Sequence, residues 1–308
     1  MKGVDMDYCP FDIVQSFDAL DLETRRVTTP YGALVVHASR KRRSDTCTLY
    51  IHGVGADWTT WTPIMRAEAE CGLDVHDQVF IDMPGFGASE NKLDRLEIAQ
   101  VGAAILAAAE SLGYARLRIV GHSMGGFLTL DMASRYPSQI DSIHLIAGSY
   151  FSILTSIQHP LLSFGHDATV AATFGSQYLL ARTGSVEVTL LRLLYRLRLF
   201  RVLLIPYASH PFRLRDSVVR GLSEQANPRG LLLTAANGHG YLPDEQWARI
   251  KCPIWAVFGD KDKLVPRQDM DRLRRCQPSA NCETVADAGH LMHIERPVTV
   301  LKALNLWT

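Results

Sequence analysis

A serine flanked by glycines is the strongest chemical signal in the 308-residue chain. Gly121, Ser123 and Gly125 form a G-x-S-x-G pattern, which follows an apolar run at residues 117–120 and precedes a helix-like segment at 127–136. A serine on a sharp turn between a strand and a helix is presented to a substrate, and small neighbours avoid collisions there. An ordinary turn with an incidental serine is the alternative. Because the flanking segments match the required strand and helix, we expect Ser123 to act as a nucleophile.

A nucleophilic serine needs a base, and the base needs an acid that orients it. His290 follows a short run at residues 282–285, and Asp260 and Asp262 follow a strand-like run at 253–258. Parallel strands bring their C-terminal ends to one edge of a sheet. Along the chain, the order is serine, aspartate, histidine. Because each of these residues follows its own expected strand, their side chains can converge at that edge.

Short apolar runs that alternate with helical patterns predict the elements that position these side chains. The expected strands lie at residues 33–38, 48–52, 78–83, 117–120, 142–147 and 253–258. The expected helices include residues 61–71, closed by Gly72, and 97–112, closed by Gly113. This alternation is typical of an α/β fold with a mostly parallel central sheet and helices on both faces.

The segment at residues 149–246 breaks the alternation. Residues 151–241 hold nine Arg, no Lys and four acidic residues, and they contain no clear strand pattern. We expect a helical insertion, because an unstructured linker of that length is uncommon. Leucines surround the helical wheel of residues 189–207. We expect these leucines to pack between the inserted helices and the core. The alternative is that they contact an apolar substrate or a membrane surface.

Together, the motifs resemble the α/β-hydrolase family, in particular its cap-bearing branch with a Ser-Asp-His triad. The resemblance covers about residues 24–306. It rests on the motifs at residues 52–55 (HGVG), 82–89 (DMPGFGAS), 121–126 (GHSMGG), 259–266 (GDKDKLVP) and 289–290 (GH) with 295–297 (ERP). It implies a hydrolase core at residues 1–148 and 247–308, with a helical cap inserted at 149–246.

The resemblance also implies the roles of individual side chains. Ser123 is expected to be the nucleophile, and His290 the general base and acid. The family usually places the orienting acid three residues after the glycine that ends the strand, which favours Asp262 over Asp260. Asp287 lies three residues before His290 and is expected to cap a loop.

The pocket around a nucleophile needs donors for the oxyanion and contacts for the substrate. The main-chain N–H groups of Val54 and Met124 are the expected oxyanion donors. Trp58 follows the oxyanion loop and is a candidate substrate contact, with packing against a core helix as the alternative. His239 lies near the return to the core and is a second candidate substrate contact.

Other polar residues near these motifs are expected to be structural. His52 and His122 are expected to shape loops by hydrogen bonding rather than to transfer protons. Asp82 begins a loop that is expected to close a strand–helix junction. His293 has no third ligand near it in the sequence, so no metal is expected. The glycines at residues 53–55 lack the third glycine of a dinucleotide-binding loop, and no cofactor is expected.

Composition argues against several other classes. The chain has 32 Lys+Arg and 32 Asp+Glu, so it lacks the surplus of positive charge that a general nucleic-acid binder needs. Arginines interrupt the apolar stretch at residues 190–207, which argues against a membrane span. The six cysteines form no CxxC pair, and residues 1–10 contain no apolar signal-peptide core, so free thiols in a reducing cytoplasm are expected. The oligomeric state is left open.

The expected activity is that of a cofactor-independent serine hydrolase. It would cleave a carboxylic ester, thioester or lactone of an apolar or mixed acyl substrate through an acyl-enzyme on Ser123. Alternatives that keep the same triad are C–C bond hydrolysis, acyl transfer and a tailoring reaction such as cyclisation. Family members that cleave C–C bonds often have a tryptophan after the catalytic histidine, where this chain has Leu291. A non-enzymatic receptor for a small ligand is a further alternative.

Overall fold

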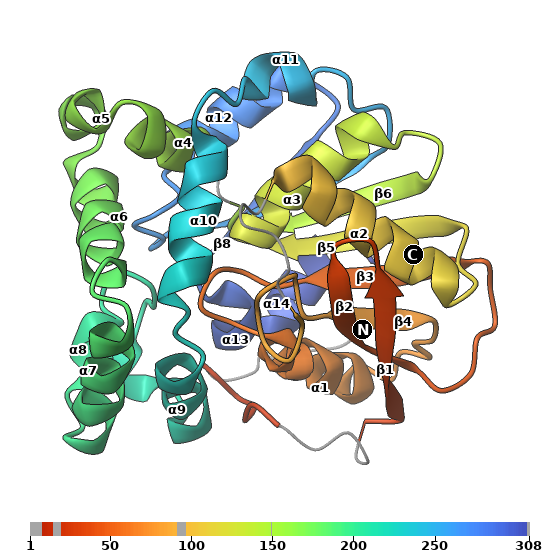
Figure 1. Ribbon diagram of the computed structural model, residues 1–308, viewed down its shortest axis with the longest axis horizontal. Coiled ribbons are helices and arrows are strands. Elements are labelled where there is room, and N and C mark those ends of the chain that lie inside the picture. The colour runs from red at the N-terminus through yellow and green to blue at the C-terminus, as the bar shows by residue number, and fades with distance from the viewer. Residues whose placement is uncertain (1–7, 15–19, 91–96, 149, 307–308) are drawn as a thin grey trace.

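The computed structural model describes residues 8–14, 20–90, 97–148 and 150–306. These residues form a central eight-stranded sheet in the order β1-β2-β4-β3-β5-β6-β7-β8 (Figure 1). The strands are β1 (Leu22–Thr29), β2 (Gly32–Ser39), β3 (Thr46–Ile51), β4 (Gln78–Ile81), β5 (Arg116–His122), β6 (Ile140–Ile146), β7 (Ile254–Gly259) and β8 (Asn281–Val285). The sheet is parallel from β4 to β8, whereas β2 pairs in an antiparallel direction with both of its neighbours, β1 and β4. The expected fold class is therefore confirmed.

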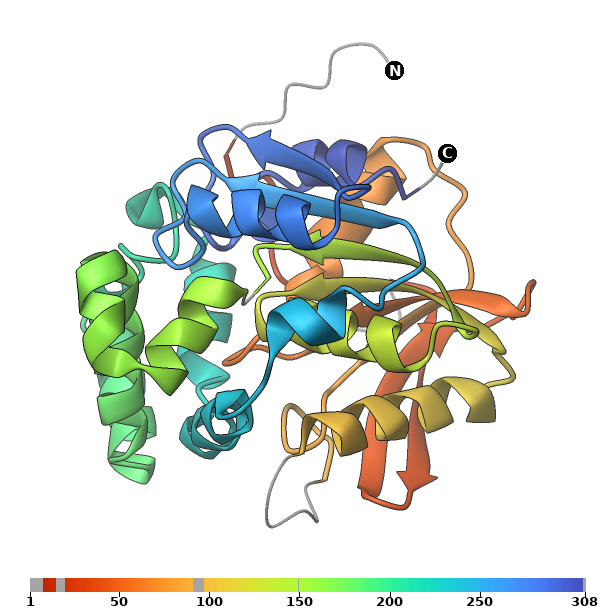
Figure 2. The same cartoon turned by 90° about the horizontal axis from the view of Figure 1, so that it is seen from above.

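Helices cover both faces of the sheet because neighbouring residues of the buried strands point to opposite sides. Leu49 and Ile51 of β3 pack with α2 (Ile98–Ser111) and α3 (Met124–Arg135) on one face. Tyr50 packs on the other face with α1 (Thr62–Glu70) and α14 (Pro297–Ala303). Figure 2 shows these two helix layers on opposite sides of the sheet. The remaining core helices are η1 (Trp58–Trp61), α12 (Arg267–Cys276) and α13 (Met292–Glu295).

The edge strand β1 was not among the expected strands. It pairs with β2 over its whole length, yet residues 23–26 are partly or fully exposed and include Glu23, Arg25 and Arg26. A sheet edge that carries charged side chains shows no apolar run, so the pattern that predicts buried strands does not detect it. The other expected strands agree with the observed ones to within a few residues.

Helices fill the chain between β6 and β7. They are α4 (Phe151–Gln158), α5 (Pro160–His166), α6 (Ala168–Ala181), α7 (Ser185–Arg196), α8 (Phe200–Leu203), η2 (Pro211–Arg213), α9 (Asp216–Glu224), α10 (Pro228–Gly238) and α11 (Pro243–Trp247). In Figure 1, α5 to α8 form a column that lies farther from the sheet than α10. Within the described residues, no helix is both long enough and apolar enough to cross a membrane.

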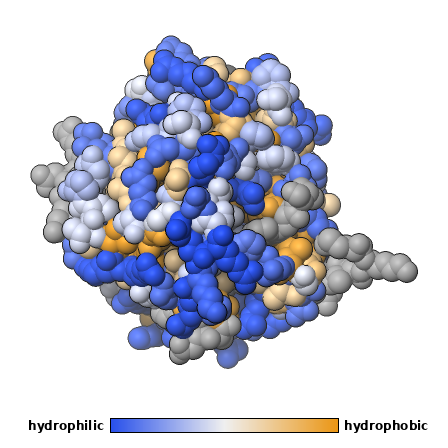
Figure 3. Space-filling model, turned by 90° about the vertical axis from the view of Figure 1, so that its right-hand side faces the viewer, coloured by the Kyte–Doolittle hydropathy of each residue, from blue (hydrophilic) through white to orange (hydrophobic). Residues whose placement is uncertain are grey.

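The leucine-rich run at residues 189–207 is only partly buried. Leu191, Phe200 and Leu204 pack into a core of the inserted helices, as the packing interpretation requires. Leu193 and Leu197 are about half exposed. The opposite side of the molecule differs, because hydrophilic side chains cover most of the face in Figure 3 and its apolar areas are small.

Candidate active site

Ser123 occupies the sharp turn between β5 and α3. Its φ is 53°, a left-handed conformation that is uncommon for a residue with a side chain. Its main-chain N–H donates to the Ile146 carbonyl at 3.0 Å, which holds the turn against β6. A Cβ on Gly125 would lie 2.1 Å from the Ile51 carbonyl oxygen, and one on Gly121 would lie 2.5 Å from the Gly125 carbonyl oxygen. Gly125 packs closely on β3, and Gly121 packs closely on the start of α3, so only glycine fits at either position.

His290 and Asp262 form a hydrogen-bonded series with the serine. The Nε2 atom of His290 lies 2.9 Å from Ser123 Oγ, and its Nδ1 atom lies 3.0 Å from Asp262 Oδ2. A carboxylate only accepts hydrogen bonds, so Nδ1 carries the hydrogen and Nε2 presents its lone pair to the serine hydroxyl. The other carboxylate oxygen accepts from the main-chain N–H groups of Leu264 at 2.8 Å and Val265 at 3.0 Å.

The two other aspartates considered for this role have different partners. Asp260 accepts a hydrogen bond from the main-chain N–H of Ala288 at 3.2 Å. Asp287 has a φ of 52° and contacts His210 at 2.7 Å as well as Arg296. Of the three aspartates, only Asp262 contacts the imidazole of His290.

Two main-chain N–H groups beside the serine are available to a ligand. Those of Val54 and Met124 donate no hydrogen bond to any residue that the structure describes. Met124 is the first residue of α3, where N–H groups have no partner within the helix. The loop that carries Val54 packs on the serine turn, since a Cβ on Gly53 would lie 3.1 Å from Ser123 Cβ. Such donors next to a nucleophile can stabilise a developing oxyanion.

Two further histidines, His122 and His293, are buried close to His290. The His122 ring contacts the His290 carbonyl oxygen at 3.0 Å through Nε2, and His293 Nε2 contacts Thr60 Oγ1 at 2.8 Å. Burial lowers the pKa of His122 well below its usual range and that of His293 to about 3. Both rings are therefore neutral at pH 7. The described residues contain no group of three or more His, Cys, Asp or Glu side chains that could hold a metal ion.

His52 and Asp82 organise the loops on the other side of the serine turn. His52 Nδ1 contacts the carbonyl oxygen of the next residue at 2.8 Å, and Nε2 accepts from the Met83 N–H at 3.1 Å. Burial lowers the pKa of His52, so its ring stays neutral. Asp82 accepts from the main-chain N–H groups of Trp58 at 3.0 Å and Ala88 at 2.9 Å. Both side chains bind main-chain groups, as expected for structural residues.

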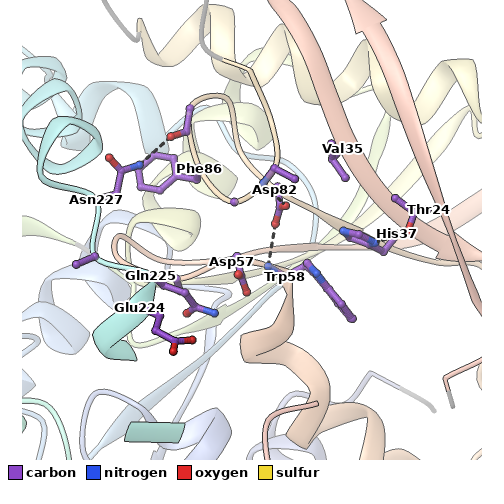
Figure 4. A pocket seen from close by; sticks show the side chains of 15 residues that line it. Thr24, Val35, His37, Asp57, Trp58, Asp82, Phe86, Glu224, Gln225 and Asn227 are labelled. Atoms are coloured by element: carbon purple, nitrogen blue, oxygen red, sulfur yellow. Dashed lines mark hydrogen bonds between the residues drawn. The ribbon is translucent and has the colours of Figure 1, made fainter. Parts of the chain in front are cut away.

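Trp58 lines a cavity of about 510 Å³ between the core and the inserted helices (Figure 4). Its ring packs on His37, with a centroid distance of 4.4 Å. The cavity is bounded by Phe86 from the core and by Gln225 and Asn227 from the connection between α9 and α10. Its lining does not include Ser123 or His290. The substrate role of Trp58 therefore stays a prediction.

His239 follows the last residue of α10, where it is exposed. Its expected substrate contact also stays a prediction. A second cavity, of about 710 Å³, lies between the chain after α8 and the loop that carries Asp262. Its lining includes Ile205, Phe212 and Lys263. Asp262 also lines this cavity, so the inserted segment faces the aspartate that contacts His290.

A buried glutamate, which the sequence did not single out as functional, joins the inserted segment to the His290 loop. Glu295 is fully buried, and its carboxyl accepts from the Ser209 N–H at 2.8 Å, the Ser209 hydroxyl at 2.6 Å and the Gly289 N–H. The Tyr207 carbonyl accepts from the His290 N–H at 2.7 Å. The signal in the sequence was the motif at residues 295–297 (ERP), which begins with this glutamate.

Comparison with known proteins agrees with this geometry. The family model described as alpha/beta hydrolase fold matches residues 49–297. Among solved structures, naproxen esterase (carboxylesterase NP) from Bacillus subtilis superimposes with a TM-score of 0.69 at 18% identity, covering 92% of this chain and 90% of that one. At this identity, the superposition establishes a common fold only.

The relatives found by sequence comparison are named after different activities. Lipase 1 of Psychrobacter immobilis is 24% identical over 287 residues, which cover 89% of this chain and 80% of the lipase. The dihydrolipoyllysine-residue acetyltransferase component of the acetoin cleaving system of Pseudomonas putida is 25% identical over 249 residues, or 80% of this chain. The matched region is 58% of that acetyltransferase component, so the chain spans little more than half of that relative.

Proposed function

Because the chain belongs to the alpha/beta hydrolase fold family, we propose that it is a cofactor-independent serine hydrolase of a carboxylic ester, thioester or lactone. The observation that carries the proposal is the series from Ser123 Oγ through His290, at 2.9 Å, to Asp262, at 3.0 Å. The name of the sequence relative Lipase 1, which denotes an enzyme that hydrolyses esters, supports the same reaction class.

Acylation begins when Ser123 Oγ attacks the substrate carbonyl carbon and its proton passes to His290 Nε2. Asp262 holds the imidazole by its Nδ1–H and stabilises the positive charge that forms there. The N–H groups of Val54 and Met124 donate to the oxyanion of the tetrahedral intermediate. Nε2 then gives the proton to the leaving group, the bond to that group breaks, and the acyl group remains on the serine.

Deacylation repeats these steps with water in place of the serine hydroxyl. His290 Nε2 takes a proton from the water, whose oxygen attacks the acyl carbon. The second tetrahedral intermediate collapses and returns the proton to Ser123 Oγ, which releases the carboxylic acid. The reaction needs no group beyond the three side chains and the two main-chain donors.

The inserted residues 149–246 act in this proposal as a cap on the core formed by residues 1–148 and 247–308. A cap limits the access of water to the nucleophile and shapes the space for an acyl group. Trp58 and His239 are the side chains that we propose for contact with the substrate. The hydrogen bonds of Tyr207 and Ser209 join the inserted segment to the loop that carries His290, which supports this arrangement.

Hydrolysis of nitrophenyl esters of increasing chain length tests the proposal. Wild type and Ser123→Ala are compared side by side, and circular dichroism melting verifies that both are folded. Wild type should turn over at least one ester, whereas the variant should lose at least about a thousandfold in kcat. The chain length with the highest kcat/KM gives the depth of the acyl pocket.

A folded wild type that hydrolyses none of the esters would contradict the proposal. So would a Ser123→Ala variant with undiminished turnover. Adding an alcohol or an amine to the same assay separates acyl transfer from hydrolysis, because a transferase forms a new ester or amide. Hydrolysis is supported when the free acid is the product whether or not the acceptor is present.

A further inference from the structure

The inserted helices expose many large apolar side chains on their outer side, away from the core. We call the exposed side of α5 to α8 the outer helical face. Its members include Leu161, which is 89% exposed, Phe164 and Leu193. Figure 1 shows these helices as a column at the left edge of the molecule, with α10 between them and the core. Exposed apolar areas of this kind mark contact surfaces rather than ordinary solvent-facing helices.

The apolar side chains of α7 lie in one stripe. Val186, Leu190, Leu193 and Leu197 are spaced by four, three and four residues, which places them on the same side of a helix. They are between 38% and 63% exposed. The buried side of α7 is a different one, which packs through Leu191. Helix α7 is thus apolar on a side that contacts no other part of the described chain closely enough to bury it.

Positive charge flanks this stripe. Arg192 and Arg196 each precede a leucine of the stripe, so they lie about 100° around the helix from it. Both are exposed, as are Arg182 and Arg198, and none of the four side chains bonds to another described residue.

Negative charge is scarce in the same region. Residues 160–205 contain five Arg, no Lys and two acidic residues. Asp167 accepts hydrogen bonds from the first turn of α6, and Glu187 is buried. Arg201 pairs with Asp216 of α9 at 3.6 Å. The outer helical face therefore combines an apolar stripe with four arginines that form no ion pair among the described residues.

We propose that the outer helical face docks on the surface of an anionic phospholipid bilayer. An amphipathic helix lies in the plane of the interface with its apolar side among the acyl chains and its basic side chains at the phosphates. Leu193 and Leu197 would enter the bilayer, and Arg192 and Arg196 would meet the headgroups. A second copy of the chain fits less well, because a symmetric contact would bring the arginines of both copies together.

Vesicle co-sedimentation tests the docking without any turnover. The probe protein is the full chain with Ser123→Ala, so the result does not depend on the proposed hydrolase activity. Vesicles of phosphatidylcholine alone are compared with vesicles that also contain phosphatidylglycerol. The test variants are Leu193→Ser with Leu197→Ser, and Arg192→Gln with Arg196→Gln. Leu242→Ser is the matched control, because Leu242 is 55% exposed but lies outside the outer helical face.

We expect binding to the anionic vesicles that weakens in 0.5 M salt and is much weaker on phosphatidylcholine alone. Each arginine near an anionic surface contributes about a fivefold gain in partitioning, so the double arginine variant should bind about 25-fold more weakly. The double leucine variant should lose at least about tenfold, and Leu242→Ser should bind like the parent. Circular dichroism melting confirms that each variant is folded.

Three results would overturn the proposal. The first is no binding to anionic vesicles. The second is binding that neither double variant weakens. The third is a dimer in analytical ultracentrifugation that the double leucine variant dissociates, because the outer helical face would then be covered by a second copy. Esterase activity in the wild type is compatible with any of these results, so the two proposals fail independently.

Discussion

Replacing Asp262 by asparagine should force the wrong tautomer on His290. In the native protein, one carboxylate oxygen accepts from the Leu264 and Val265 N–H groups at 2.8 and 3.0 Å, and the other faces His290 Nδ1 at 3.0 Å. The amide oxygen of an asparagine must take the first position, because an NH2 group there would face two donors. Its NH2 group then points at Nδ1, which has to become an acceptor.

The tautomer determines the size of the expected effect. When Nδ1 accepts, Nε2 carries the hydrogen and has no lone pair for the Ser123 proton. The same exchange in a serine-protease triad lowers kcat about 10⁴-fold. At 1.36 kcal/mol for each factor of ten, this corresponds to about 5.4 kcal/mol of transition-state stabilisation. The fold should persist, because asparagine fills the same space and keeps both main-chain hydrogen bonds.

The assay measures kcat and kcat/KM of Asp262→Asn and of the control Asp260→Asn on the best nitrophenyl ester. Asp260 accepts one hydrogen bond, from the Ala288 N–H, and an asparagine oxygen can keep that bond. The control should therefore stay within about threefold of wild type. A folded Asp262→Asn enzyme within tenfold of wild type, or an equal loss in Asp260→Asn, would refute the reasoning.

Three further predictions concern packing and burial. Gly125→Ala should cost about 1–3 kcal/mol of stability and at least tenfold in kcat, because its Cβ would lie 2.1 Å from a carbonyl oxygen of β3. Gly175→Ala, with open space around its Cβ, should instead stabilise by about 0.5–1 kcal/mol in urea unfolding, and equal effects would contradict the packing argument. The pKa of His293 is about 3 when folded and about 6.5 when unfolded, so lowering the pH from 6.5 toward 3 costs about 1.4 kcal/mol per pH unit. His293→Asn should make the pH dependence of urea stability shallower by about one proton, and an unchanged slope would argue against a neutral buried ring. Ser209→Ala removes a 2.6 Å hydrogen bond to Glu295 and should cost about 1–2 kcal/mol in thermal unfolding, where an unchanged Tm would contradict the role of this contact.

The features that could be predicted are those that depend on residues close together in the sequence. The glycines around Ser123 are visible as a motif because close contacts with β3 and with the start of α3 exclude every larger residue. The buried parallel strands are visible because both of their faces are apolar. The same reasoning placed Asp262 and His290 after strands, and the structure brings these two side chains together.

Features that depend on contacts between distant segments could not be predicted. The edge strand β1 has few apolar residues, since one side of it meets water. Glu295 is part of a recognisable motif, but its partner Ser209 lies 86 residues away in the inserted segment. The exposure of Leu193 could not be read from composition, because a leucine-rich helix looks the same whether neighbours cover it or not.

The hydrogen bonds between the inserted segment and the His290 loop have a consequence for recombination. Tyr207 accepts a hydrogen bond from the main chain of His290, and Ser209 donates to Glu295. Residues 207–210 are therefore held by the core, although they lie within the inserted segment. A chimaera that exchanges the whole insertion with that of a relative would remove the support of the histidine loop. Crossover points placed after β6 and before Tyr207 would transplant α4 to α8 and leave that support intact.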